Sequence, residues 1–176
     1  LELNVHAYPQ ADKLLHAKEN NISQQYILTD VAHLKESWEQ SRLFLMPINS
    51  NNGRIIGICG FEISSVYFQQ RTKQANYKGY PLITAILDKK ADNEYQGQLS
   101  NPASFVNANI KMSSDGEHEF FTAGQESFIG YTAPLKVGAS EHKVAVMLHA
   151  DSYYHLQQQA KMRLLIMLGI ILLLSL

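Results

Sequence analysis

Five residues of the chain have side chains that could together bind a small charged molecule: Trp38, Arg42, Phe61, Glu62 and Tyr80. Trp38 and Arg42 are four positions apart, which places them on one face if their segment is helical. A guanidinium, a carboxylate and aromatic rings are the groups with which a pocket holds a zwitterion or an organic acid. The sequence therefore predicts a small-molecule ligand, such as an amino acid or an organic acid. Two plainer interpretations stay open, because the aromatic residues could fill a core and Glu62 could cap a following helix.

Catalytic and metal-binding patterns are not evident in the sequence. Its seven histidines are scattered, with no pair at the spacing of a zinc protease helix, and are best read as surface residues. A nucleophile elbow, a phosphate-binding loop and a dinucleotide fingerprint are also absent from the sequence. Cys59 is the only cysteine, so it can form no intramolecular disulfide, and we expect it to be a small buried hydrophobe. We expect no metal, no cofactor and no enzymatic activity in this region.

The composition limits the remaining classes of function. The chain has 176 residues, of which 45% are hydrophobic, enough for one medium-sized domain or two small lobes with a real core. The net charge is -1, so the chain lacks the basic surface that nucleic acid binding requires. We therefore expect no nucleic acid partner.

The last residues of the chain, 164–176, are apolar and uncharged, with Ser175 as their one polar side chain. A membrane span needs about 20 such residues, so this run is either the beginning of a transmembrane helix or a buried helix of a soluble protein. A helix buried in a small domain usually keeps a polar stripe, and this one has none, which favours the membrane. The sequence thus predicts a water-facing region over residues 1–162 and the start of a transmembrane helix over 163–176.

The hydrophobic pattern predicts an α+β fold with short antiparallel hairpins. Helices are expected near Pro9, over residues 31–42 and 65–78, and from Ser152 into the apolar tail, with Ser64 as an N-cap. Residues 89–104 are expected to be a loop, and Asn52-Gly53 should make a tight turn. Strand 54–63 is apolar on both faces and should be central. The expected strands are 25–30, 42–48, 54–63, 82–88, 105–112, 119–122, 127–136 and 142–149.

The segment of residues 53–64 resembles a strand of Cache domains, the PAS-like extracytoplasmic sensors of bacterial receptors. In that family the strand has glycines spaced as in this chain and ends in Asp-Ile-Ser. The matching residues are Gly53, Gly57, Gly60, Ile63 and Ser64, and Glu62 stands where the family usually has Asp. The resemblance extends over about residues 40–176. It implies a PAS-like antiparallel sheet flanked by helices, with a C-terminal helix that continues into a membrane span.

The resemblance also implies a function and a location. The chain would be the ligand-sensing domain of a chemoreceptor, a histidine kinase or a diguanylate cyclase in a bacterial inner membrane. It would face the periplasm or the extracellular side, form a homodimer and pass its signal through the C-terminal helix, and any kinase or cyclase activity would belong to a cytoplasmic part. Two layouts stay open, a single module or two lobes divided near residues 76–81. The alternative function is a membrane-anchored periplasmic domain that binds or scaffolds other proteins.

Overall fold

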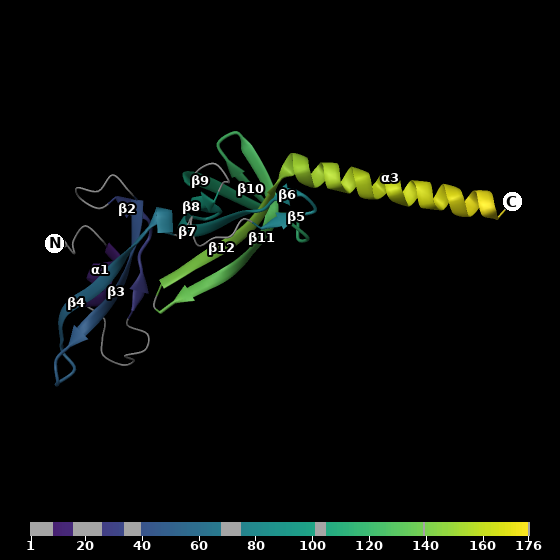
Figure 1. Cartoon of the computed structure of the whole chain (residues 1–176). Coiled ribbons are helices and arrows are strands. Elements are labelled where there is room, and N and C mark those ends of the chain that lie inside the picture. The colour runs from purple at the N-terminus through teal and green to yellow at the C-terminus, as the bar shows by residue number, and fades with distance from the viewer. Residues whose placement is uncertain are drawn as a thin grey trace.

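The computed structural model describes residues 9–15, 26–33, 40–67, 75–100, 105–138 and 140–175. Within them the chain is α+β, as predicted, with mainly antiparallel strands and a long C-terminal helix. Figure 1 shows a small N-terminal sheet at one end, a second sheet in the middle and the helix projecting from the other end. The middle sheet closes into a barrel.

The N-terminal sheet is built around one long strand. The strand β3 (Gln40–Asn49) pairs with β1 (Ile27–Leu28) and β2 (Ala32–His33) along one edge and with β4 (Ile55–Ser64) along the other. The helix α1 (Pro9–Leu15) covers one face, and the small core between them contains Ala11, Leu14, Ile27, Leu43 and Leu45. Alternate residues of β3 therefore face α1, and the residues between them face the other side of the sheet.

The barrel is an antiparallel meander of six strands. Each strand pairs with the next, and the last pairs with the first, so the sheet has no free lateral edge. Its strands are β7 (Ile83–Ala91), β8 (Glu94–Ser100), β9 (Phe105–Ser114), β10 (Glu119–Ala123), β11 (Glu126–Val137) and β12 (Ser140–His149). A short hairpin of β5 (Asn76–Tyr77) and β6 (Tyr80–Pro81) precedes β7.

Side chains fill the interior of the barrel. Its core contains Ile83, Ala85, Leu87, Tyr95, Leu99, Ile110, Phe121, Phe128, Ala145 and Met147. Packing is close enough that Gly97 of β8 has no room for a side chain, because an added Cβ would collide with Ile110 and lie 2.9 Å from the Cδ2 atom of Leu87. A ligand could therefore enter this part of the barrel only by displacing core residues.

The helix α3 (Ala150–Leu174) follows β12 without a loop, and it is long and apolar enough to cross a membrane. None of its residues is buried. Its 25 residues correspond to a length of about 37 Å. The part before Leu164 contains Gln157, Gln158 and Gln159, so only its second half has the composition of a membrane span.

Most of the predicted strands agree with the structure, but three other predictions are wrong. The predicted loop 89–104 is wrong over 94–100, which form β8 and pair on both sides, and 101–104 lie outside the described residues. The predicted helix 31–42 is replaced at its described ends by β2 and the start of β3, and 34–39 lie outside the described residues. The predicted helix 65–78 is helical over 65–67, where the Ser64 hydroxyl accepts a hydrogen bond from the amide of Tyr67 as an N-cap does. Its end is wrong, because β5 begins at Asn76, and 68–74 lie outside the described residues.

The strand β4 is also placed differently from the prediction. We expected it to be central, since it is apolar on both faces, but in the described residues it pairs only with β3. Several of its apolar side chains are accordingly exposed, among them Ile56 and Phe61. The Asn-Gly turn before it is present, with the Gly53 amide donating to the Ser50 carbonyl oxygen at 2.9 Å.

Candidate functional site

The five residues predicted to bind a ligand do not form one site in the described structure. Trp38 lies outside the described residues. Arg42 is buried at 1% exposure, whereas Phe61 is 57% exposed. Glu62 accepts a hydrogen bond from the Ser41 hydroxyl, and Tyr80 lies far along the chain beside α3, where its hydroxyl is 2.7 Å from Nδ1 of His155. Because these side chains have separate partners, their binding of a common ligand stays a prediction.

Arg42 instead belongs to a buried polar cluster between the N-terminal sheet and the barrel. Its Nη1 atom is 2.8 Å from Oδ1 of Asp88, and its Nη2 atom donates to Oδ2 at 2.9 Å. On the other side of the carboxylate, Nδ1 of His142 is 2.8 Å from the same Oδ1. Arg42 comes from β3, Asp88 from β7 and His142 from β12, so the cluster joins the two sheets. We call these three residues the junction cluster.

The segment 28–31, which begins at the last residue of β1, supplies further partners of the junction cluster. Arg42 donates to the carbonyl oxygen of Thr29 at 3.1 Å, and the amide of Val31 donates to Oδ2 of Asp88 at 3.3 Å. Nε2 of His142 lies 3.1 Å from the carbonyl oxygen of Leu28. The cluster thus satisfies backbone groups that would otherwise be buried without partners.

His142 links the two sheets through both nitrogens of its ring. Its Nδ1 contacts the carboxylate of Asp88 on β7, and its Nε2 contacts the carbonyl oxygen of Leu28 on β1. Both of these partners are hydrogen-bond acceptors. One side chain of β12 therefore connects the barrel to the N-terminal sheet.

Burial alone would raise the pKa of Asp88, because a charged carboxylate is poorly solvated in the protein interior. Hydrogen bonds from His142 and Arg42, together with the positive charges of these residues, outweigh that effect and hold the pKa below its ordinary value. Asp88 is therefore an anion between the guanidinium of Arg42 and the imidazole ring of His142. This arrangement stabilises the junction only while all three partners are present.

A metal ion is a poorer occupant of this place than the observed side chains. Asp30, Asp88 and His142 have potential ligand atoms within 4.8 Å of one another. However, Oδ1 of Asp88 already accepts from Arg42 and His142, and Oδ2 accepts from Arg42 and Val31. Asp30 also forms an ion pair with Lys90, at 3.7 Å. A cation would have to displace the guanidinium of Arg42, so the geometry favours a structural ion network.

The junction cluster is connected directly to the C-terminal helix. The strand β12 begins beside the N-terminal sheet, where the Ser140 hydroxyl accepts a hydrogen bond from the amide of Leu28 at 2.9 Å. It contains His142, ends at His149 and continues as α3 from Ala150. One strand of roughly 30 Å therefore links the N-terminal sheet to the helix.

The N-terminal sheet also has an exposed apolar face, which we call the aromatic face. The rings of Tyr26, Phe44 and Phe61 stack in sequence, with centroid distances of 5.4 and 5.1 Å. Met46 and Ile48 continue the row along β3 and are both partly exposed, and Cys59 lies opposite Met46 on β4. Cys59 is exposed, so the prediction that it is a buried hydrophobe is wrong.

Sequence reasoning identified Arg42 but missed its partners. Asp88 ends one predicted strand and His142 begins another, and polar residues at strand ends are usually exposed. The sequence did contain one signal that Asp88 has partners of its own. Neighbouring residues of a strand face opposite sides, so Asp88 lies on the opposite face of β7 from the core residue Leu87. Only the pairing of β12 with β7 shows that the two faces meet.

Comparison of the chain with models of known protein families, with curated proteins and with solved structures found no match. The resemblance to Cache domains stays a prediction.

Proposed function

We propose that the chain is the extracytoplasmic sensor domain of a bacterial transmembrane receptor. The observation that supports this best is the continuous connection from the N-terminal sheet through the junction cluster and β12 to α3. A ligand that moves the N-terminal sheet would pull on His142 and thus on the strand that leads into the helix. Since packed cores and interfaces switch between discrete arrangements, such a movement would be transmitted as a shift or rotation of α3.

Strand order does not distinguish a Cache-like module from a plain closed barrel. PAS-like modules place their first and last strands side by side, and β7 and β12 pair in this way. A closed meander has the same adjacency, however, and β9 here occupies the position where a PAS-like module would have helices between two sheet edges. The proposal therefore rests on the junction cluster and α3, and the ligand, the homodimer and the output activity are expectations attached to it.

The proposal can be tested with the chain held in lipid nanodiscs. Amino acids, organic acids and polyamines would be screened for a rise in the unfolding midpoint. A ligand present at 100 times its dissociation constant should stabilise the folded state by about 2.7 kcal/mol. A spin label at the exposed Ile56 of β4 and another on α3 should then report a change in distance. The small-molecule proposal fails if no compound of these classes changes either signal.

A matched variant tests the path of the signal. Asp88→Asn keeps the size of the side chain but removes its charge, and so weakens the link from β7 to Arg42 and His142. A ligand that binds the N-terminal sheet should still bind this variant but should move α3 less. An equal movement of α3 in the variant and in the unchanged chain would exclude the junction cluster from the path.

A second candidate function is a membrane-anchored protein-interaction domain. The aromatic face supports this candidate, because contiguous exposed apolar surface often marks a protein contact. Substitution Met46→Ser would separate the two functions, because Met46 is exposed on the aromatic face and is not one of the residues predicted to bind a small molecule. It should abolish binding of a protein partner with little effect on the unfolding free energy, whereas a sensor would keep its response to a small molecule.

A further inference from the structure

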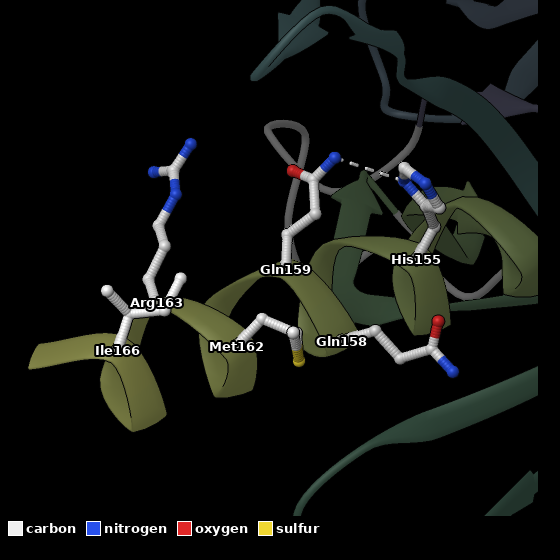
Figure 2. Close-up of a pocket in the computed structure, with 6 residues that line it drawn as sticks. All are labelled: His155, Gln158, Gln159, Met162, Arg163 and Ile166. Carbon is white, nitrogen blue, oxygen red and sulfur yellow. Dashed lines mark hydrogen bonds between the residues drawn. The ribbon is translucent and has the colours of Figure 1, made fainter. Parts of the chain in front are cut away.

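A row of polar side chains on α3 faces the β5–β6 hairpin just before the apolar part of the helix. The row consists of His155, Gln159 and Arg163, spaced four residues apart, so they lie on one side of the helix. Figure 2 shows these three side chains projecting to the same side, with a hydrogen-bond contact of 3.5 Å between the amide nitrogen of Gln159 and Nδ1 of His155. The hairpin reaches this row through the contact of Tyr80 with His155.

The hairpin and the helix form an open hollow of mixed polarity. Its polar lining consists of Lys78, Gln159 and Arg163. Its apolar lining consists of Leu156, Ala160, Leu164 and Met167, all on α3. The hollow is therefore lined by two cationic groups and by an apolar surface of the helix. Among the described residues, no acidic side chain lines it.

We propose that this hollow binds the phosphate headgroup of an anionic phospholipid of the membrane that α3 enters. The inference rests on the membrane placement of α3 in the proposed function. Arg163 directly precedes the uncharged run that begins at Leu164, so a helix inserted along that run holds Arg163 at headgroup level. Lys78 lines the same hollow and so lies near the same depth.

The chemistry of the hollow matches the two parts of a lipid. The guanidinium of Arg163 and the ammonium of Lys78 complement a phosphate, the guanidinium with two parallel hydrogen bonds. Leu164 and Met167 lie beside them and offer contact to the first carbons of the acyl chains. The aromatic residues Tyr77 and Tyr80 flank Lys78, and tyrosine is enriched at the membrane interface. The lipid would thus join the hairpin to α3 and fix the depth of the domain.

The test uses the whole chain in vesicles of phosphatidylcholine alone and of an equal mixture with phosphatidylglycerol. Lipids that remain with the protein after gentle extraction would be counted by native mass spectrometry. Phosphatidylglycerol should be retained in preference to phosphatidylcholine. Lys78→Gln and Arg163→Gln should each lower this preference about 5-fold, the effect expected for one basic residue near an anionic surface.

Lys161→Gln is the matched control, because Lys161 is a basic residue of the same helix that does not line the hollow. Equal loss in the Lys161→Gln variant would show unspecific charge attraction and overturn the proposed site. Retention unchanged in all variants would also overturn it. Free phosphate and added phosphatidylglycerol vesicles would each be tested for displacement of the retained lipid. If free phosphate displaces it as effectively as the vesicles do, the site binds soluble phosphate and the lipid proposal is wrong.

Two further outcomes separate this inference from the proposed function. If the chain does not insert into neutral vesicles, both the sensor proposal and the proposed lipid site lose their basis. A chain that inserts and crosslinks efficiently through Ala160→Cys to a second copy, without retained lipid, overturns the lipid site but leaves the sensor proposal intact. Insertion with preferential retention that depends on Lys78 and Arg163 supports the lipid site.

Discussion

The interior of the barrel and the junction between the barrel and the N-terminal sheet are both buried, but they are built from opposite chemistry. Leu87 and Asp88 are neighbours on β7 and are almost completely buried. Leu87 points into an apolar core, whereas Asp88 faces Arg42 and His142. Apolar contacts tolerate small shifts, but a carboxylate that accepts four hydrogen bonds fixes position and orientation. The barrel core thus provides stability, and the junction determines how one sheet sits on the other.

The largest effect is expected from removal of the carboxylate at the junction. Asp88→Ala leaves the guanidinium of Arg42 buried without its counter-charge and removes the carboxylate partner of His142, which should lower the unfolding free energy by about 3–5 kcal/mol. Urea unfolding followed by circular dichroism measures this loss. Asp92→Ala is the control, since its side chain is 97% exposed and pairs with Lys89 at the surface. An equal loss of unfolding free energy in Asp88→Ala and Asp92→Ala would contradict the role assigned to the junction cluster.

Removal of the neighbouring core residue should have a similar or smaller effect on stability, of about 2–5 kcal/mol, but a different structural consequence. Leu87→Ala opens a cavity inside the barrel and leaves the hydrogen bonds of Asp88 in place. Hydrogen exchange should quicken at barrel amides, while a spin-label distance between β4 and β12 stays constant. A changed distance in Leu87→Ala would show that the two faces of β7 are not independent.

Replacement of the Arg42–Asp88 ion pair by apolar side chains should have a smaller effect on stability. In many proteins a buried ion pair can be exchanged for hydrophobic residues without loss. Here the double variant Arg42→Met, Asp88→Leu also removes the partners of the Thr29 carbonyl and the Val31 amide. We therefore expect a remaining cost of about 1–3 kcal/mol in the unfolding free energy. A fully stable double variant would mean that these backbone groups find water or other partners.

The smallest effect is a pH dependence confined to acid. The pKa of Asp88 is lower in the folded than in the unfolded chain, so its stabilising contribution is present above the unfolded pKa of about 3.9. That contribution is lost as the pH falls through the lower folded pKa. The difference in unfolding free energy between the unchanged chain and Asp88→Asn should therefore narrow in acid below about pH 4. A difference that stays constant to low pH would contradict the lowered pKa.

Local patterns predicted those parts of the fold that depend on local chemistry. The strands now seen as β3, β9, β11 and β12 were recognisable from their hydrophobic pattern, and the turn at Gly53 from its Asn-Gly sequence. The strand β8 was missed because Gln96, Gly97 and Gln98 look like a loop. Gly97 is there because the barrel interior is crowded, which is a property of strands far away in the sequence.

The junction cluster was beyond sequence reasoning for the same physical cause. Arg42 was predicted to meet a ligand, since a single sequence does not show which carboxylate a guanidinium will contact. Its partner Asp88 is 46 positions away, and His142 is 54 positions beyond that. Their meeting depends on closure of the barrel, which brings β12 beside β7. The long apolar helix, in contrast, depends on its own composition alone, and it was predicted well.

Because no loop separates His149 from Ala150, the direction in which the side chains of α3 point depends on the number of residues that precede them. In a strand, one inserted residue turns every later side chain to the opposite face. In a helix, one inserted residue rotates all later residues by about 100°. An insertion between His142 and His149 would therefore leave the junction cluster in place and turn the later part of β12, with the start of α3, to the opposite face. An insertion between Ala150 and His155 would leave β12 unchanged and rotate Arg163 by about 100° relative to Lys78, so strand phase and helix direction can be varied separately.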